Sequence, residues 1–339
     1  MKEYLERIVA KENLSFNESF ALMSAIMSGG VNNSHLAGLL IALKSKGETP
    51  EEVAGFAKAM RDKGIKINCT DENAIDVCGT GGDGSGSFNI STATAFAAAG
   101  AGVKVAKHGN RSISSKCGSA DVLQELGINI NLSPEQSEQA LNQIGIAFLF
   151  APLYHPAMKY AATVRKELGI KTVFNMLGPL TNPAGVKKQI IGTFSSAAAK
   201  TMSEAAKFLE LDKVCFLCSN DRYDEIYLGD STIIYEYNKY SEIKSYNISN
   251  ETFDYPLISE QQIAGDTPEI NARIILEVFE NKTRNGAFHT IAANTALALF
   301  CAGMSNDLNE CKKAAEESIF SGAALNKLNE LREFGKRAA

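Results

Sequence analysis

Residues 76–92 read DVCGTGGDGSGSFNIST, a run that leaves an apolar strand, crosses five glycines and reaches a polar helix start. Glycine permits positive φ and lets the backbone approach a bound anion, while the unpaired N–H groups at a helix start point toward negative charge. The run therefore predicts a phosphate-binding loop. A second loop, Lys107 to Ser119, is rich in basic and hydroxyl side chains. Together the two loops predict a substrate with more than one phosphate group.

The glycine run also resembles known nucleotide motifs, of which residues 79–84 match the dinucleotide pattern G-x-G-x-x-G. In that motif the helix begins within the glycines, and an acidic residue follows about 20 residues later. Here more loop residues precede a helix start near Ser91, and the next apolar run, Val103 to Ala106, ends in Lys107-His108. No Gly-Lys-Ser/Thr closes the run as in a Walker loop, and a plain turn needs fewer glycines. A phosphate loop of another kind is favoured.

Composition places the chain among ordinary globular proteins. It has 339 residues, of which 45% are hydrophobic and 22% charged, enough for a large core and for two domains. The net charge of -5 argues against a nucleic-acid surface, which needs a basic stripe. We expect no membrane span, because no apolar run approaches about 20 residues, and no signal peptide at the amino terminus. These features predict a cytoplasmic protein.

The seven cysteines are expected to be reduced thiols, because their number is odd and no secretory signal precedes them. Cys215 and Cys218 have the spacing of a redox or zinc pair. They lie, however, in the apolar run Val214 to Cys218, and no second pair lies at metal-ligand distance. The run is therefore predicted to be a strand in the core.

The first 69 residues have a helical pattern. Ser15-x-x-Glu18 has the form of a capping box, and Thr49-Pro50 supplies a cap with a proline at the first helical position. Apolar residues recur at spacings of three and four. They form two stripes: Leu22, Met23 and Ile26, and Leu36, Leu39, Leu40 and Leu43. We interpret these stripes as core or subunit contacts.

Beyond Thr70 short apolar runs alternate with helical ones, which predicts an α/β fold with a mostly parallel sheet. The expected strands are Ile75 to Cys78, Val103 to Ala106 and Ile128 to Ile130, and the expected helices are Thr92 to Ala99, Ala120 to Leu126 and Pro134 to Ile144. In such sheets ligands collect at the carboxyl ends of the strands. Since Gly79 and Lys107 directly follow predicted strand ends, both loops are expected to face one cleft.

Six short strings occur in one order along this chain. They are Gly79-Thr80-Gly81-Gly82-Asp83, Asn89-Ile90-Ser91-Thr92, Lys107-His108-Gly109-Asn110-Arg111, Gly118-Ser119-Ala120-Asp121, His155-Pro156-Ala157-Met158 and, from Asn175 to Pro183, N-x-x-G-P-L-T-N-P. Together they resemble the anthranilate phosphoribosyltransferase family of tryptophan biosynthesis. The resemblance runs from Lys46-Gly47-Glu48-Thr49 in the helical part to Ser321-Gly322, so it covers nearly the whole chain.

The resemblance implies an architecture and a set of ligands. The fold would be of the nucleoside phosphorylase/phosphoribosyltransferase type, with a helical domain at 1–69, joined by a segment near 166–188, and an α/β domain at 70–339. The family also implies a homodimer formed through the helical domains. Its substrates are anthranilate and 5-phosphoribosyl 1-pyrophosphate (PRPP), the latter held by two magnesium ions per subunit.

The resemblance also assigns site residues. For PRPP the matching positions are Gly79, Gly82, Asp83, Ser87, Asn89, Ile90, Ser91, Thr92, Lys107, His108, Gly109, Asn110, Arg111, Ser112, Ile113, Ser114, Ser115 and Ser119. For magnesium they are Ser91, Asp224 and Glu225, and for anthranilate Gly79, His108, Asn110 and Arg165. Carboxylates suit magnesium, and a planar guanidinium suits the anthranilate carboxylate. No general base is assigned, and His155 is interpreted as a turn residue.

The chain departs from the family pattern at a few positions. The acidic pair is usually preceded by glycine and an aliphatic residue, whereas this chain has Arg222-Tyr223, which puts the metal geometry or the loop mobility in question. Ser87 replaces a common threonine but keeps the hydroxyl. Cys117 replaces a common serine and puts an oxidisable thiol in the phosphate loop.

Two other functions share this fold. A pyrimidine nucleoside phosphorylase has a similar glycine loop, but it tends to have a longer carboxyl-terminal part and a glycine-rich stretch where this chain has residues 114–119. A non-catalytic nucleic-acid-binding relative is expected to be basic and need not keep the acidic pair. This chain is acidic and keeps both Asp224 and Glu225.

Overall fold

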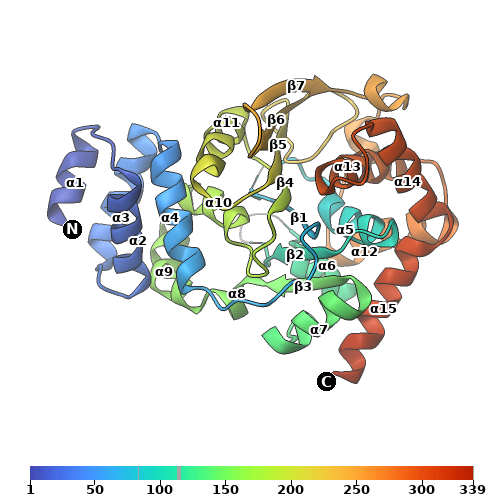
Figure 1. The fold of residues 1–339 in the computed structure, drawn as a ribbon, viewed down its shortest axis with the longest axis horizontal. Coiled ribbons are helices and arrows are strands. Elements are labelled where there is room, and N and C mark those ends of the chain that lie inside the picture. Colours follow the sequence, from blue (N-terminus) through green and yellow to red (C-terminus); the bar gives the residue numbers. More distant parts are fainter. Residues whose placement is uncertain (83, 113–115, 339) are drawn as a thin grey trace.

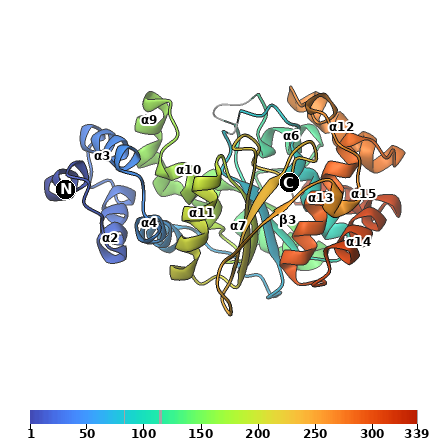
Figure 2. The ribbon, with the colours of Figure 1, turned by 90° about the horizontal axis from the view of Figure 1, so that it is seen from above.

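The computed structural model describes residues 1–82, 84–112 and 116–338. Figure 1 shows a bundle of the first helices at one end of the molecule and a twisted sheet in its middle, with the carboxyl-terminal helices on the far side. Seen from above, α10 and α11 lie between this bundle and the sheet (Figure 2). In the described part of the chain, no helix is long and apolar enough to cross a membrane.

The amino-terminal bundle contains four helices, whose starts follow from local sequence. Ser15 and Glu18 form the predicted capping box, and Thr49 and Glu52 form a second one in front of Pro50. Each box satisfies backbone N–H groups that a helix start would otherwise leave unpaired. The helices are α1 (Lys2–Val9), α2 (Phe16–Met27), α3 (Asn33–Lys46) and α4 (Pro50–Lys63).

Both predicted apolar stripes of this bundle are buried within the single chain. Leu22 on α2 and Leu39 and Leu43 on α3 are each about 1% exposed. Leu39 and Leu43 are therefore core residues, so that of the two interpretations of this stripe, core or subunit contact, the structure supports the core. The exposed apolar side chains of the bundle are instead Val9 on α1, at 66%, and Ile41 on α3, at 42%.

The sheet has the order β3-β2-β1-β4-β5-β6-β7. The five strands β3, β2, β1, β4 and β5 pair in parallel, whereas β6 pairs antiparallel with both β5 and β7. The prediction of a mostly parallel sheet is therefore confirmed. The strands are β1 (Ile75–Gly79), β2 (Val105–Gly109), β3 (Ile146–Phe150), β4 (Lys188–Gly192), β5 (Lys213–Ser219), β6 (Thr232–Asn238) and β7 (Lys244–Ile248). Cys215 and Cys218 lie buried in β5, as predicted for a core strand.

Helices cover both faces of this sheet. On one face α11 contacts β5 and β6 and also reaches α4, while on the other α5 and α13 contact β1 and β4. Successive residues of β1 point to opposite faces of the sheet. Val77 packs in the core with α5 and α13, and Cys78 packs in the core with α4 and α11. The covering helices are α5 (Ile90–Gly100), α11 (Ser196–Ala205), α12 (Pro268–Asn281), α13 (Gly286–Ala302), α14 (Leu308–Phe320) and α15 (Ala323–Arg337).

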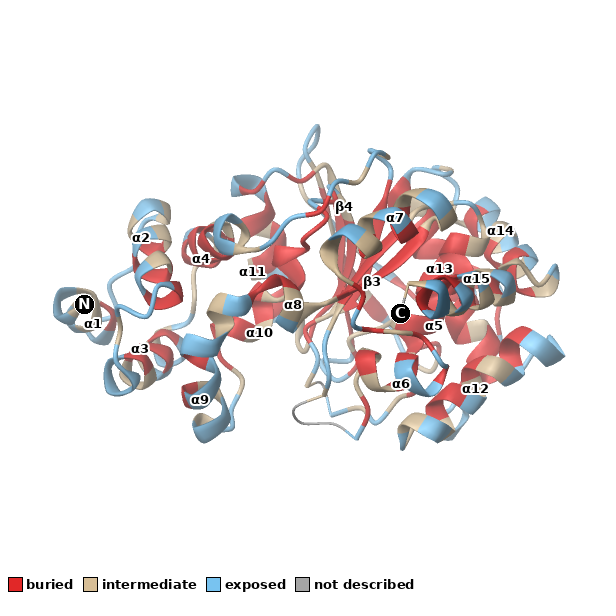
Figure 3. Cartoon of the chain, turned by 90° about the horizontal axis from the view of Figure 1, so that it is seen from below, coloured by how far each residue is buried: buried red, intermediate tan, exposed pale blue. Residues whose placement is uncertain are grey.

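The segment between β3 and β4 packs on the amino-terminal bundle. Its helices are α8 (Ala151–Tyr154), α9 (Lys159–Leu168) and α10 (Val173–Leu177). Helix α9 contacts α2 and α3, and α10 contacts α3 and α4. Buried residues of this segment, such as Val164 and Leu177, share one apolar core with the bundle. Figure 3 shows this core as a buried band, with exposed residues on the outer faces of α1 and α9.

Two local predictions differ from the structure. Residues Ile128–Ile130 were expected to form a strand, but they lie in the connection between α6 (Ser119–Glu125) and α7 (Pro134–Ile144). Ile128 and Ile130 are buried at 3% and 2% exposure, so they fill the core without sheet pairing. Strand β2 begins at Val105 and continues to Gly109, and Lys107 therefore lies inside the strand and not after it.

Candidate active site

The glycine loop and the acidic pair meet at the carboxyl ends of β1 and β4. A Cβ atom on Gly79, the last residue of β1, would overlap the carboxylate of Asp224, and one on Gly192, the last residue of β4, would overlap the Asp224 backbone. Only glycine at both strand ends lets the acidic segment come this close. The backbone N–H of Gly81 donates to Asp224 Oδ2 at 3.2 Å.

Glu225 reaches the same loop further along. Ser87 Oγ donates to Glu225 Oε2 at 3.4 Å, so both acidic side chains touch the glycine loop although they are more than 130 residues away in the chain. Among the described residues, no group of three or more His, Cys, Asp or Glu side chains could hold a metal ion. Two carboxylates beside a phosphate loop instead fit a magnesium ion that takes most of its oxygens from a bound diphosphate and water.

Lys107 lies beneath this loop as a buried cation. Its Nζ donates to the backbone carbonyl of Val77 at 2.7 Å and to Ser91 Oγ, in the first turn of α5, at 3.2 Å. Burial lowers the pKa of Lys107, and the nearby Asp76 opposes that shift. Burial also raises the pKa of Asp76, which accepts the His108 backbone N–H at 3.1 Å. The strand interior thus places the Lys107 amine, held by two oxygen acceptors, under the phosphate loop.

Asp121 organises the second loop. It accepts hydrogen bonds from Arg111 Nη1 at 2.7 Å, from the Ser112 backbone N–H at 3.3 Å and from the Gly118 backbone N–H at 2.9 Å. Ser119 Oγ closes the loop by donating to the Asn110 carbonyl at 3.2 Å. This role of Asp121 was not predicted, although an aspartate at the third helical position, where it can accept the N–H of the residue before the helix, is a readable signal.

The remaining predicted residues lie around these groups. Asn89 Oδ1 accepts from Cys117 Sγ and from Asn271 Nδ2, which ties the glycine loop to the second loop and to α12. The side chains of Ile90 and Thr92 are buried in the core, and Gly82 and Gly109 lie half-buried in the two loops. Four predicted positions lie outside the described residues: Asp83, Ile113, Ser114 and Ser115.

His108 and His155 form a buried pair beside Lys107. Their ring centroids are 5.2 Å apart at an angle of 59°, and the Nε2 atom of each has no hydrogen-bond partner among the described residues. Burial lowers the pKa of His108 to about 3 and that of His155 to about 4. Both imidazoles are therefore neutral at pH 7, and such weakly basic rings are poor candidates for a general base.

The low pKa of His155 makes a prediction for acid stability. His155 takes up a proton at a pKa near 6.5 in the unfolded chain but only near 4 in the folded chain. The contribution of neutral His155 to the free energy of unfolding is therefore fully present above pH 6.5 and is lost as the pH falls toward 4. His155 alone should lower the free energy of unfolding by about 2 kcal/mol between pH 7 and pH 5. His155→Gln should flatten the fall in melting temperature over that range, measured by thermal denaturation. The exposed His35→Gln serves as control, and equal slopes in wild type and His155→Gln would contradict the prediction.

Arg165 lies on α9 with its guanidinium 5.0 Å above the ring of Phe174, the second residue of α10. Burial lowers the pKa of Arg165, and no described carboxylate opposes that shift. The same helix α10 leads to Gly178, whose backbone hydrogen-bonds to His108. The structure therefore connects Arg165 to the histidine pair through one short helix, and it leaves Arg165 available to an anionic ligand.

Comparisons with known proteins agree with this geometry. The helical bundle domain of a glycosyl transferase family matches residues 2–64, and the a/b domain of that family matches residues 71–325. An anthranilate phosphoribosyltransferase from Alkaliphilus metalliredigens is 44% identical over 331 residues, which are 98% of this chain and 97% of that protein.

Solved structures give the same result. Anthranilate phosphoribosyltransferase from Thermus thermophilus superposes with a TM-score of 0.92 at 36% identity, covering 98% of this chain and 99% of that one. The Saccharomyces cerevisiae enzyme in complex with PRPP and Mg has a TM-score of 0.90 at 27% identity, covering 99% and 97%. A further yeast structure contains 4-fluoroanthranilate. On the strength of both sequence and fold, the chain belongs to the anthranilate phosphoribosyltransferase family.

Proposed function

We propose that this protein transfers the phosphoribosyl group of PRPP to the amine of anthranilate, which gives N-(5-phosphoribosyl)anthranilate and pyrophosphate in tryptophan biosynthesis. The observation that carries the proposal is the meeting of the glycine loop with Asp224 and Glu225 above the buried Lys107. An acidic pair that can hold a divalent cation, a phosphate loop and a buried lysine donor are groups suited to the binding and release of a diphosphate.

The reaction breaks the bond between ribose C1 and the pyrophosphate oxygen and forms a bond from C1 to the anthranilate nitrogen. Positive charge develops on the sugar and negative charge on the leaving group. The N–H groups of the glycine loop, the start of α5 and Lys107 face that leaving group in our proposal, with the second loop around the 5-phosphate. Bound magnesium would neutralise part of the pyrophosphate charge.

Asp224, Glu225 and Ser91 fit a magnesium site because all three offer oxygen atoms next to the phosphate loop. The yeast relative carries Mg together with PRPP. We propose two magnesium ions per subunit here, each completed by phosphate oxygens and water.

For the acceptor, we propose that Arg165 pairs with the anthranilate carboxylate, with Asn110, Gly79 and His108 near the amine. A neutral aromatic amine is already nucleophilic, so positioning next to C1 can supply much of the acceleration without a strong base. The nitrogen's proton leaves to water or to pyrophosphate once the C–N bond forms. The neutral state of His108 agrees with this account.

A direct assay tests the function. The protein is incubated with PRPP, magnesium and anthranilate, and the loss of anthranilate fluorescence is followed together with pyrophosphate release. Parallel reactions with phosphate and a pyrimidine nucleoside, and binding to single-stranded and duplex DNA, examine the two alternatives. Turnover of the nucleoside without turnover of anthranilate would refute the proposal.

The bundle supports a proposal about assembly. A shallow hollow between α1 and α3 is lined by Ile8, Val9, Lys11, Ala37, Gly38, Ile41, Ala42, Ser45 and Lys46. Val9 and Ile41 expose their side chains there, and exposed apolar groups of this kind favour a partner surface. We propose a homodimer through this face. We also propose the domain division at residues 69 and 70, with the segment near 166–188 added to the helical domain.

Charged substitutions at Val9 and Ile41 should produce monomers. Because every candidate ligand of the phosphates lies at or beyond Gly79, these monomers should keep much of the turnover but melt at a lower temperature. Sedimentation combined with the fluorescence assay measures both properties. Tyr240→Glu, at a residue 83% exposed on the β6–β7 turn, is the matched control. A monomer that is fully folded yet inactive would mean that the active site is shared between subunits.

A further inference from the structure

Arg222, two residues before the acidic pair, is held by a carboxylate from a distant segment. Its guanidinium makes two parallel contacts with Glu260, Nη1 to Oε1 at 2.5 Å and Nη2 to Oε2 at 3.0 Å. It also lies 5.2 Å above the ring of Tyr223. Such bidentate pairing is the preferred geometry of arginine with a carboxylate. Both residues that distinguish this chain from the usual family pattern before Asp224 therefore take part in one contact.

Glu260 belongs to a segment that is itself fixed on the glycine loop. We call residues 259–266 the strap. The Phe88 backbone N–H donates to the Ile263 carbonyl oxygen at 3.0 Å, and the Gly265 backbone N–H donates to the Gly86 carbonyl oxygen at 2.8 Å. At its end Asp266 pairs with Lys116 at 2.5 Å. The strap thus touches both phosphate loops, and it keeps Glu260 in place beside the acidic segment.

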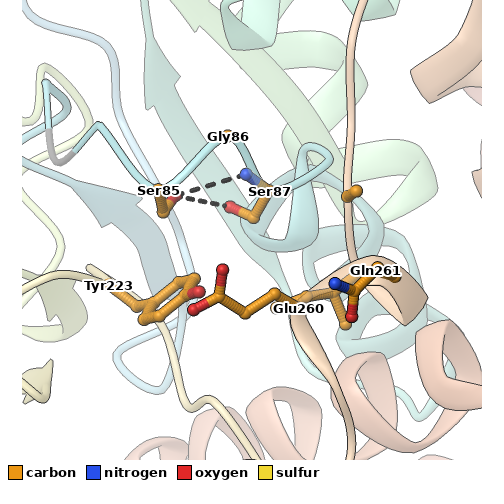
Figure 4. A pocket seen from close by; sticks show the side chains of 8 residues that line it. Ser85, Gly86, Ser87, Tyr223, Glu260 and Gln261 are labelled. Carbon is orange, nitrogen blue, oxygen red and sulfur yellow. Dashed lines mark hydrogen bonds between the residues drawn. The ribbon is translucent and has the colours of Figure 1, made fainter.

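A cavity of about 210 Å³ lies between residues 85–87 of the glycine loop, Tyr223 and the strap. Figure 4 shows the Glu260 carboxylate pointing toward Tyr223, with Ser85 and Ser87 across the cavity. Ser87 is also the residue that contacts Glu225. The Arg222–Glu260 pair and the proposed metal carboxylates therefore border the same loop.

Arg222 lies only two residues before the acidic pair, and a guanidinium and a divalent cation compete for the same carboxylates. The neighbouring carboxylate of Asp221 has another partner, because it accepts the Ser196 backbone N–H at 2.5 Å. We propose that Glu260 is a positioning residue for the metal site: it holds the Arg222 guanidinium, so that this group does not compete with magnesium for Asp224 and Glu225. This inference rests on the proposed function, and it concerns a residue outside the ligand set.

The test measures PRPP binding by isothermal titration calorimetry at a series of magnesium concentrations, without anthranilate, so that no turnover is needed. Glu260→Gln frees Arg222 and should raise the magnesium concentration for half-maximal binding about two- to fivefold, the range of an exposed ion pair. Arg222→Ala removes the competitor and should leave that concentration at the wild-type value. The double variant Arg222→Ala/Glu260→Gln should return to the wild-type value as well.

If both single variants raised the magnesium concentration for half-maximal PRPP binding equally, the proposal would be overturned, because the Arg222–Glu260 pair would then only hold two segments together. Glu277→Gln, which breaks the exposed Arg273–Glu277 pair on α12 with the same change of charge, should have no effect. Melting temperatures measured without PRPP show whether any variant is misfolded. A separate Asp224→Ala/Glu225→Ala variant tests the proposed metal site itself, since magnesium dependence that survives there would refute that site and not the role of Glu260.

Discussion

Replacing both Asp224 and Glu225 by alanine is expected to lower turnover at limiting magnesium by roughly a hundredfold or more, the scale of losing a main electrostatic group at a leaving anion. The two carboxylates touch the glycine loop at Gly81 and Ser87, where the pyrophosphate would lie. Without them a divalent cation would keep only phosphate oxygens, Ser91 and water. Initial rates over a magnesium titration measure the effect.

The alanine pair alone does not separate charge from structure, since Asp224 also accepts a backbone hydrogen bond from Gly81. The nearly isosteric pair Asp224→Asn/Glu225→Gln removes the charge and keeps one acceptor oxygen on each side chain. Both double variants should lose activity and show little change in melting temperature. Asp62→Asn, which removes an exposed carboxylate from the Lys58 pair on α4, controls for the loss of negative charge. Wild-type rates in either double variant at limiting magnesium would show that the pair holds no metal.

Local sequence was sufficient for the features that depend on neighbouring residues. The capping box at Ser15 and the helix cap at Thr49 form as predicted, because a cap and its partner lie within one turn. Helix α5 begins at Ile90, one residue from the expected start near Ser91, because the glycine run ends there. The parallel sheet followed from the alternation of apolar strands and helices.

Other features could not be read locally because their causes are distant in the chain. Lys107 lies inside a strand, where an apolar residue is expected, because its ammonium finds acceptors on β1 and α5. The burial of Leu39 depends on α1, α9 and α10, which pack against α3. Nothing near Arg222 in the sequence indicates that Glu260, 38 residues away, would hold it.

Arg165→Ala is expected to raise the anthranilate KM by roughly tenfold to a thousandfold, because a bidentate contact between a guanidinium and a carboxylate contributes a few kcal/mol. The PRPP KM should change little, since Arg165 lies on α9 and belongs to neither phosphate loop. Steady-state kinetics with each substrate varied in turn measure the two constants. Lys166→Ala, at the exposed neighbour on the same helix, should leave both KM values unchanged.

Arg165→Lys distinguishes recognition of the carboxylate from packing of the helix. Lysine keeps the positive charge but loses the planar fork that pairs with a carboxylate and stacks on Phe174. If Arg165 binds anthranilate, the lysine variant should fall between wild type and alanine in anthranilate KM, with kcat changed less than KM. If Arg165 only fixes α9 against α10, the KM values for both substrates should rise equally. An equal rise of the two KM values would therefore assign Arg165 to the scaffold and leave the anthranilate carboxylate to another cation.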